Sequence, residues 1–401
     1  MRVVYYISAH GYGHGVRSCE VVNAIRRRGQ SQSRSRSLSE NQSGNLGGNP
    51  SLNLSRNLGG SLSGDPGDVD VRVVSGLPAS FLEARLGSDT DLRHESFDVG
   101  MAQLDSVRID PDASLLAVER LLASWDARVE SEARALEAAE ADVVVCDIPG
   151  IPIEAARARG IPAVAVGNFG WDWIYEPYAQ ADGRWRPAVN RFAGAYAQCD
   201  LLLRLPFAEP MTAFPKREDM PLSGQPGSDR RLEIASMTGA DPTMRWVLLS
   251  FTSLEWDDAA LDRAGAVPRT EYFTVLPLAW GQPHFHAVDP QSVPFRDVLA
   301  SCDLVVSKPG YGIVSECIVN QTPLVHAVRT GFPEYPILVD AIERYLRHAL
   351  LSETDLYEGR LGPALDRVEA APEPRERPSL GGADAVADRI LGIARAGSRN
   401  R

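Results

Sequence analysis

The chain has 401 residues, which is long for one ordinary domain and comfortable for two. It is 44% hydrophobic and 23% charged, as expected of a globular protein. Its 53 acidic and 41 basic residues give a net charge of −12, which argues against a protein that holds nucleic acid through phosphate contacts. No apolar run reaches the roughly 20 residues of a membrane span, and the first ten residues indicate a strand and not a signal peptide.

The five cysteines are scattered along the chain and form no C-x-x-C pair. An odd number without pairing favours reduced thiols over a disulfide framework or a zinc site. We therefore expect a cytoplasmic protein without a bound metal.

One segment, residues 31–68, differs from the rest in composition. Ten of its 38 residues are serine, seven are glycine and five are asparagine. Such a segment buries too little apolar surface to offset the entropy lost on ordering, so it is predicted to be a disordered insertion. Its Ser/Arg alternation leaves a phosphorylated or RNA-binding tail as the alternative.

Outside the insertion, the first half of the chain alternates between apolar strands and helices. Strands are expected at 3–7, 69–74, 142–146, 161–166 and 201–205, and helices at 16–28, 113–139 and 153–158. Continuous β-branched strands between helices are typical of a parallel sheet that is covered on both faces. This pattern predicts a Rossmann-like α/β domain over residues 1–210.

The same pattern starts again after a segment rich in Pro, Gly and charge, which predicts a linker at 211–230. Strands are expected at 246–251, 272–276, 304–307 and 323–326. They predict a second Rossmann-like domain over 231–370, and a last helix is expected at 383–396 after a Pro-rich hinge. Two open sheets of this kind leave a cleft at the carboxyl ends of their strands.

The first strand runs into the glycine-rich turn S-A-H-G-Y-G-H-G at residues 8–15, which places His10 and His14 at the rim of the cleft. The spacing is G-x-G-x-G and not the G-x-G-x-x-G of a dinucleotide site, and no acid follows the next strand. Either histidine could only cap the turn. If His14 lies at a helix start, the helix dipole disfavours imidazolium, and the neutral ring can accept a proton.

A histidine base needs a carboxylate that fixes its tautomer, and Asp147 follows the strand D-V-V-V-C on the same rim. The alternative for Asp147 is a plain helix N-cap. A third rim loop, G-N-F-G-W-D-W, holds Trp171 and Asp172, and its aromatic side chains could face an acceptor or pack in the core.

The second half contains the motif K-P-G-Y-G-I-V-S-E at residues 308–316, which joins a strand to a helix. A glycine turn before a helix exposes backbone N–H groups that bind a diphosphate. Lys308 adds a cation or is only a surface charge. Glu316, expected in the first helical turn, could accept from ribose hydroxyls or only favour the helix start. Glu334, after the next strand, is expected to face the same cleft, and no P-loop kinase motif occurs.

These stretches together resemble the GT-B glycosyltransferases, in particular the N-terminal glycosyltransferase-like domain of plant L-arabinokinases and the UDP-glycosyltransferases. The resemblance rests on Y-Y-I-S-A-H-G-Y-G-H-G, C-D-I-P-G-I-P, C-D-L-L-L-R-L-P and K-P-G-Y-G-I-V-S-E, and it covers most of the chain outside 31–68. It implies a GT-B fold with an N-terminal acceptor domain, a C-terminal nucleotide-sugar domain and a crossover helix. The implied function is inverting transfer of a sugar from a nucleotide sugar to an acceptor hydroxyl, with a UDP-sugar as the favoured donor and no cofactor.

The resemblance also implies roles for individual residues. His14 would be the base and Asp147 its partner, with the acceptor near His10, Trp171 and Asp172. The implied donor-binding residues are Lys308, Gly310, Tyr311, Gly312, Ser315, Glu316 and Glu334. The sequence departs from the family after the first strand of the second domain, where S-F-T-S-L replaces a glycine-rich turn and Thr252 and Ser253 offer hydroxyls instead. A nucleotide-sugar 2-epimerase and a non-catalytic sugar-nucleotide-binding protein remain the alternatives.

Overall fold

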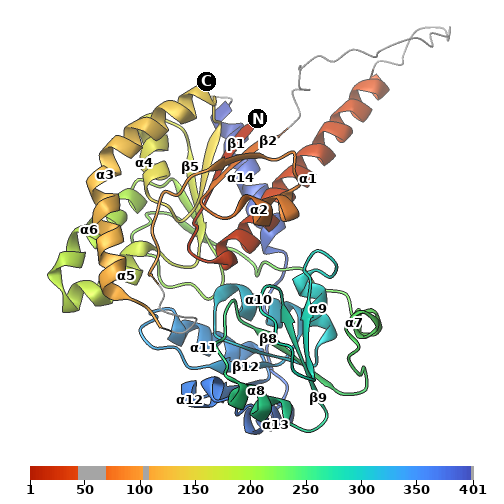
Figure 1. Ribbon diagram of the computed structural model, residues 1–401. Coiled ribbons are helices and arrows are strands. Elements are labelled where there is room, and N and C mark those ends of the chain that lie inside the picture. Colours follow the sequence, from red (N-terminus) through yellow and green to blue (C-terminus); the bar gives the residue numbers. More distant parts are fainter. Residues whose placement is uncertain (44–68, 103–107, 399–401) are drawn as a thin grey trace, which may run out of the picture.

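The apolar runs of the first half form one parallel sheet in the computed structural model, which describes residues 1–43, 69–102 and 108–398 (Figure 1). The strand order is β3-β2-β1-β4-β5-β6-β7. The strands are β1 (Arg2–Ile7), β2 (Asp70–Ser75), β3 (Asp91–His94), β4 (Val143–Asp147), β5 (Ala163–Gly167), β6 (Leu201–Arg204) and β7 (Arg217–Asp219).

The second half forms a six-stranded parallel sheet with the order β10-β9-β8-β11-β12-β13. Its strands are β8 (Arg245–Ser250), β9 (Thr270–Val275), β10 (Phe285–Val288), β11 (Leu304–Ser307), β12 (Leu324–Ala327) and β13 (His348–Leu351). Two such parallel-sheet units facing one another define the GT-B arrangement expected from the sequence.

Both faces of each sheet are covered by helices. The first sheet is flanked by α1 (Tyr12–Ser43), α2 (Ala79–Leu86), α3 (Pro111–Ala138), α4 (Ile151–Ala158), α5 (Trp171–Ala181), a 3-10 turn (Gly183–Trp185), α6 (Arg186–Tyr196) and α14 (Gly382–Ser398). The second sheet is flanked by α7 (Arg231–Thr238), α8 (Asp258–Gly265), α9 (Phe295–Ser301), α10 (Tyr311–Asn320), α11 (Tyr335–Tyr345), α12 (Glu353–Tyr357) and α13 (Gly362–Ala370).

The central strand β4 explains why its sequence is continuously apolar. Val144 and Cys146 pack into the core beneath α3 to α6, whereas Val143 and Val145 pack on the opposite face against α1 and α14. All five residues of β4 are buried. A fully buried valine contributes about 1.5–3 kcal/mol, so neither face of this strand tolerates a polar substitution.

The C-terminal helix α14 crosses back from the second domain to the first sheet. Its apolar face, Val386, Ile390 and Ala394, is completely buried in the core beside α1. The chain therefore passes between the two domains twice.

Two predictions on chain organisation need correction. The predicted linker 211–230 contains β7, which extends the first sheet along β6. Helix α1 does not end at Arg28 but continues to Ser43, because no glycine or proline occurs from residue 30 to residue 43. Its last part therefore belongs to the segment predicted as a disordered insertion, and residues 44–68 lie outside the described residues.

Candidate functional site

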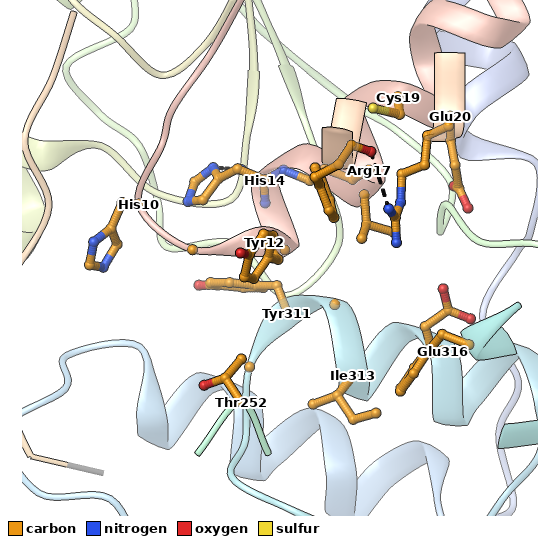
Figure 2. A pocket seen from close by; sticks show the side chains of 18 of the residues that line it. His10, Tyr12, His14, Arg17, Cys19, Glu20, Thr252, Tyr311, Ile313 and Glu316 are labelled. Atoms are coloured by element: carbon orange, nitrogen blue, oxygen red, sulfur yellow. Dashed lines mark hydrogen bonds between the residues drawn. The ribbon is translucent and has the colours of Figure 1, made fainter. Parts of the chain in front are cut away.

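The carboxyl ends of both sheets face a cleft with a volume of about 2140 Å³. The rim on the first side is built from the ends of β1 and β4, which are adjacent and place Ile7 beside Asp147. The rim on the other side is built from the ends of β8 and β11, with Ser250 beside Ser307. The starts of α1 and α10 face each other across this space (Figure 2).

His14 and Asp147 meet at the first rim, as the sequence predicts for a base and its partner. His14 is the third residue of α1, and its Nδ1 lies 2.9 Å from Oδ1 of Asp147. Asp147 is completely buried and His14 is 6% exposed. The N-cap of helix α4 is Gly150 and not Asp147. The Asp147 carboxylate therefore does not cap that helix and contacts His14 instead.

The same carboxylate binds two further side chains that sequence analysis did not single out. Arg17 donates from Nε to Oδ2 of Asp147 over 2.9 Å and from Nη2 to Oδ1, and the Ser18 hydroxyl donates to Oδ2 over 2.7 Å. Arg17 also donates from Nη1 to Oδ1 of Asn168, which follows β5. One signal was available in the sequence: Arg17 lies three residues after His14 and so shares its face of the helix.

Electrostatics keep this carboxylate ionised. Burial raises the pKa of Asp147, but the charges of Arg17 and His14 and their hydrogen bonds outweigh it and hold the pKa well below its usual range. A buried carboxylate that accepts this many hydrogen bonds is a permanent counter-charge at neutral pH.

His10 lies near the pair formed by His14 and Asp147, called the dyad below, but in a different environment. Its ring makes an edge contact with Trp171 at 5.3 Å between centroids and packs on the backbone of Gly100, where a Cβ atom would lie 1.6 Å from Nδ1. Burial, with the nearby charges of His14, Arg329 and Lys308, lowers the pKa of His10 to about 3. His10 is therefore neutral at physiological pH.

The aromatic loop after β5 divides between the cleft and the core. Trp171 and Phe169 line the cleft although each is almost fully buried, and Trp171 Nε1 donates to the buried Asp98 over 2.8 Å. Asp172, expected beside the acceptor, lies in the first turn of α5 and is not among the described residues that line the cleft. Burial raises its pKa to about 6.

The second rim carries the donor-binding candidates. Lys308, Gly310, Tyr311 and Gly312 line the cleft, and α10 begins at Tyr311 with Gly310 as its N-cap. Thr252 lines the same space from the loop after β8. Ser315 instead lines a small cavity between α1 and α10.

Glu316 lies in the second turn of α10 and not in the first turn as expected, because the helix starts two residues earlier than predicted. Its Oε2 is buried and has no hydrogen-bond partner among the described residues. Burial raises its pKa to about 7, helped by the charge of Glu20 from α1 and opposed by Arg296 and Arg85. Figure 2 shows Glu20 opposite Glu316.

Glu334 also lines the cleft, as expected, and forms a 3.6 Å ion pair with Arg329. Sequence analysis did not single out Arg329. It is 8% exposed, and its guanidinium packs 3.3 Å from the centroid of the Phe332 ring. Burial raises the pKa of Glu334 and lowers that of Arg329 to about 10.

Within residues 1–43, 69–102 and 108–398, no group of three or more His, Cys, Asp or Glu side chains is arranged to hold a metal ion. In the same part of the chain, no helix combines the length and apolar character needed to span a bilayer.

Comparison with known proteins places this geometry in a known architecture. No protein-family model matches the chain. Plant UGT89C1 from Arabidopsis thaliana, complexed with quercetin, aligns over 98% of this chain and 99% of its own, with a TM-score of 0.59 and 15% identity. The calicheamicin glycosyltransferase CalG4 aligns over 100% and 97%, with a TM-score of 0.55 and 16% identity. The chain thus has the fold of GT-B glycosyltransferases.

A curated relative of greater sequence similarity is L-arabinokinase from Arabidopsis thaliana. It is 28% identical over 380 residues, which are 91% of this chain and 32% of the relative. The chain therefore spans about a third of the length of that protein. The resemblance inferred from the sequence motifs is confirmed by these matches.

Proposed function

We propose that the protein is an inverting glycosyltransferase that moves a sugar from a nucleotide-diphosphate sugar, with a UDP-sugar as the favoured donor, to an acceptor hydroxyl. The observation that carries this proposal is that His14 pairs with the buried Asp147 and faces the start of α10 across the cleft (Figure 2). The GT-B architecture supports it, since the solved structures of similar fold include CalG4, which is named as the calicheamicin glycosyltransferase.

In the proposed reaction, His14 is the general base. Asp147 holds Nδ1, so Nε2 is the nitrogen that takes the proton from the acceptor hydroxyl. The acceptor oxygen attacks the anomeric carbon while the bond from that carbon to the diphosphate breaks, which inverts the configuration. A positioned base of this kind typically contributes about 10²–10⁴-fold in rate.

The donor is proposed to lie on the second domain. Backbone N–H groups at the start of α10, with Lys308, would stabilise the departing diphosphate without an obligatory metal. Glu316 would accept from the ribose hydroxyls, and Glu334 would bind the transferred sugar. On the opposite wall, His10 and Trp171 would contact the acceptor, whereas Asp172 does not line the cleft and is given no such role.

A screen of nucleotide sugars by thermal shift, followed by incubation of each bound donor without an acceptor, tests the reaction class. Slow release of free sugar supports a transferase. Conversion to an epimer of the donor supports a nucleotide-sugar 2-epimerase, and binding without any turnover, with or without acceptors, supports a non-catalytic sugar-nucleotide-binding protein. The architecture is compatible with each outcome, so the products decide.

The proposed base is tested directly by substitution. His14→Ala should lower turnover at least about a hundredfold and leave donor affinity nearly unchanged, because the donor-binding residues lie on the other domain. Asp147→Asn should lower turnover less than His14→Ala does. Turnover of the double variant should be only slightly below that of His14→Ala alone. His10→Ala serves as the neighbouring control and should lose less than His14→Ala. An active His14→Ala enzyme would refute the mechanism.

We also propose that the protein acts in the cytoplasm. All five cysteines are unpaired and buried, which fits a reducing compartment.

A further inference from the structure

Arg17 contacts both members of the His14–Asp147 pair. Its guanidinium donates hydrogen bonds to both carboxylate oxygens of Asp147 and to the side chain of Asn168. Arg17 thereby links helix α1 to the ends of β4 and β5. Its side chain is 14% exposed. A bidentate hydrogen bond between an arginine and a carboxylate fixes the orientation of the carboxylate more firmly than one hydrogen bond does.

The guanidinium also reaches the histidine itself. Its Nη2 lies 2.9 Å from Nδ1 of His14, the same distance as that between Nδ1 and Oδ1 of Asp147. Nδ1 therefore either donates to Asp147 or accepts from Arg17. Since a general base needs its free lone pair on Nε2, the productive ring carries its proton on Nδ1, and Arg17 must direct its own hydrogens at Asp147.

The charges at this point have a consequence for proton uptake. Arg17 and Asp147 together are neutral, so protonation of His14 creates a net positive charge within a buried cluster. A cation within hydrogen-bond distance opposes formation of imidazolium. Asp147 alone would favour it.

We propose that Arg17 is a positioning residue of the transferase reaction that fixes Asp147 and sets the pH range in which His14 remains an available base. This inference rests on the proposed function and extends it to a residue that acts through the dyad. Loss of the Arg17 charge should make His14 bind a proton more readily. As the pH is lowered, activity should therefore begin to fall at a higher pH than in the wild type.

Other charged groups also face His14 and must be considered. Asp98, from the segment before α3, and Glu334, from the segment before α11, interact electrostatically with the ring, as does His10. Burial raises the pKa of both carboxyls and lowers that of His10. Among these groups, only Asp147 and Arg17 lie within hydrogen-bond distance of the ring in the described structure.

The test compares Arg17→Gln, which removes the charge but can still donate to Asp147, with Arg17→Lys, which keeps the charge. The acid limb of the profile of kcat/KM against pH should move upward by about one unit in Arg17→Gln, and it should stay near the wild-type position in Arg17→Lys. A purely structural role would lower kcat/KM evenly across pH. An unmoved acid limb in Arg17→Gln overturns the inference.

A partly buried ion pair that joins β3 to α3, away from His14, provides a matched control. Arg93 donates to the buried Glu132 over 2.7 Å, and neither residue lines the cleft. Arg93→Gln should cost stability in the same way and leave the acid limb in place. An equal movement of the limb in Arg93→Gln would also overturn the inference, because any lost ion pair would then have the same effect.

A second readout separates this inference from the proposed function. The chain has seven histidines, so the ring of His14 can be assigned by NMR in histidine-labelled protein with His14→Gln as the reference. The midpoint of its titration should rise in Arg17→Gln even if no acceptor is found. Absence of turnover with every donor would refute the proposed function, whereas an unchanged midpoint would refute the role of Arg17.

If Arg17→Gln does not fold, the double variant Arg17→Gln with Asp147→Asn keeps the cluster neutral. The midpoint of the His14 titration in this double variant should lie above that in Asp147→Asn alone.

Discussion

Affinity for a nucleotide sugar should depend on pH through Glu316. Burial and the charge of Glu20 raise the pKa of Glu316 to about 7, and its Oε2 has no partner in the described structure. A ribose hydroxyl donates to a carboxylate but finds only a weaker acceptor in the protonated acid. Nucleotide binding should therefore select the ionised form, and affinity should rise as the pH rises through 7.

The size of the effect follows from the fraction of Glu316 that is ionised. If only the carboxylate binds, about a tenth of the protein is competent at pH 6 and about nine tenths at pH 8, which changes Kd about tenfold. That factor corresponds to about 1.4 kcal/mol. Calorimetric titration with an intact nucleotide sugar is the suitable assay, since its diphosphate does not titrate in this range.

Two variants isolate the group responsible. Glu316→Gln should bind weakly at every pH and lose the dependence. Glu20→Gln should keep the dependence but move its midpoint to lower pH, because the like charge that disfavours ionisation of Glu316 is gone. Wild-type affinity that stays constant from pH 6 to pH 8.5 would refute the reasoning, and so would a Glu316→Gln variant that keeps the slope.

Two further predictions concern the same wall of the cleft. Lys308 and Lys216 are the only lysines of the chain, and Lys308 lines the cleft whereas Lys216 is exposed elsewhere, so a bound nucleotide sugar should protect Lys308 alone from an amine reagent. Equal labelling of both, measured by peptide mass spectrometry, would contradict donor binding there. The hydroxyls of Tyr311 and Tyr272 are both buried and have no hydrogen-bond partner in the described structure. Tyr311 lines the cleft, whereas Tyr272 does not. Tyr311→Phe should lower turnover about tenfold or more while Tyr272→Phe leaves it unchanged, and equal kinetics in the two variants would contradict this.

The fold was predictable where burial on both sides dictates the sequence. The central strands β1, β4 and β5 are continuous runs of apolar residues, and their alternation with helices was sufficient to indicate parallel sheets. The missed strands β3 and β7 are short and polar, because edge strands bury little surface and owe their conformation to one neighbour. Strands β10 and β13 are also edge strands, but they were missed because four-residue runs such as F-H-A-V and H-A-L-L are too short for their pattern to separate a strand from a helix.

The site was predictable where the topology alone brings residues together. Asp147 and His14 follow adjacent parallel strands, so their meeting at one rim required only the correct strand order. The contact of Arg17 with Asp147 spans 130 positions and depends on the rotamer of a long side chain, which no local pattern specifies. Glu316 lies in the second turn and not in the first because the helix starts at Tyr311, two residues before the predicted start, and this start is set by the conformation of Gly310, which the sequence leaves open.

The connection between the two domains bears on how such a cleft could close. The outgoing segment near Leu222 and the returning segment near Leu380 run side by side, with Leu222 N–H donating to the Ser379 carbonyl over 2.8 Å and Gly382 N–H donating to the Leu222 carbonyl over 3.0 Å. A movement of one domain against the other must therefore bend both segments together. Helices α1 and α10 already approach closely at their starts, where a Cβ atom on Gly312 would lie 3.6 Å from Cα of Gly13. A paired hinge limits sideways displacement, so His14 on α1 would stay aligned with the start of α10 if one domain moved against the other.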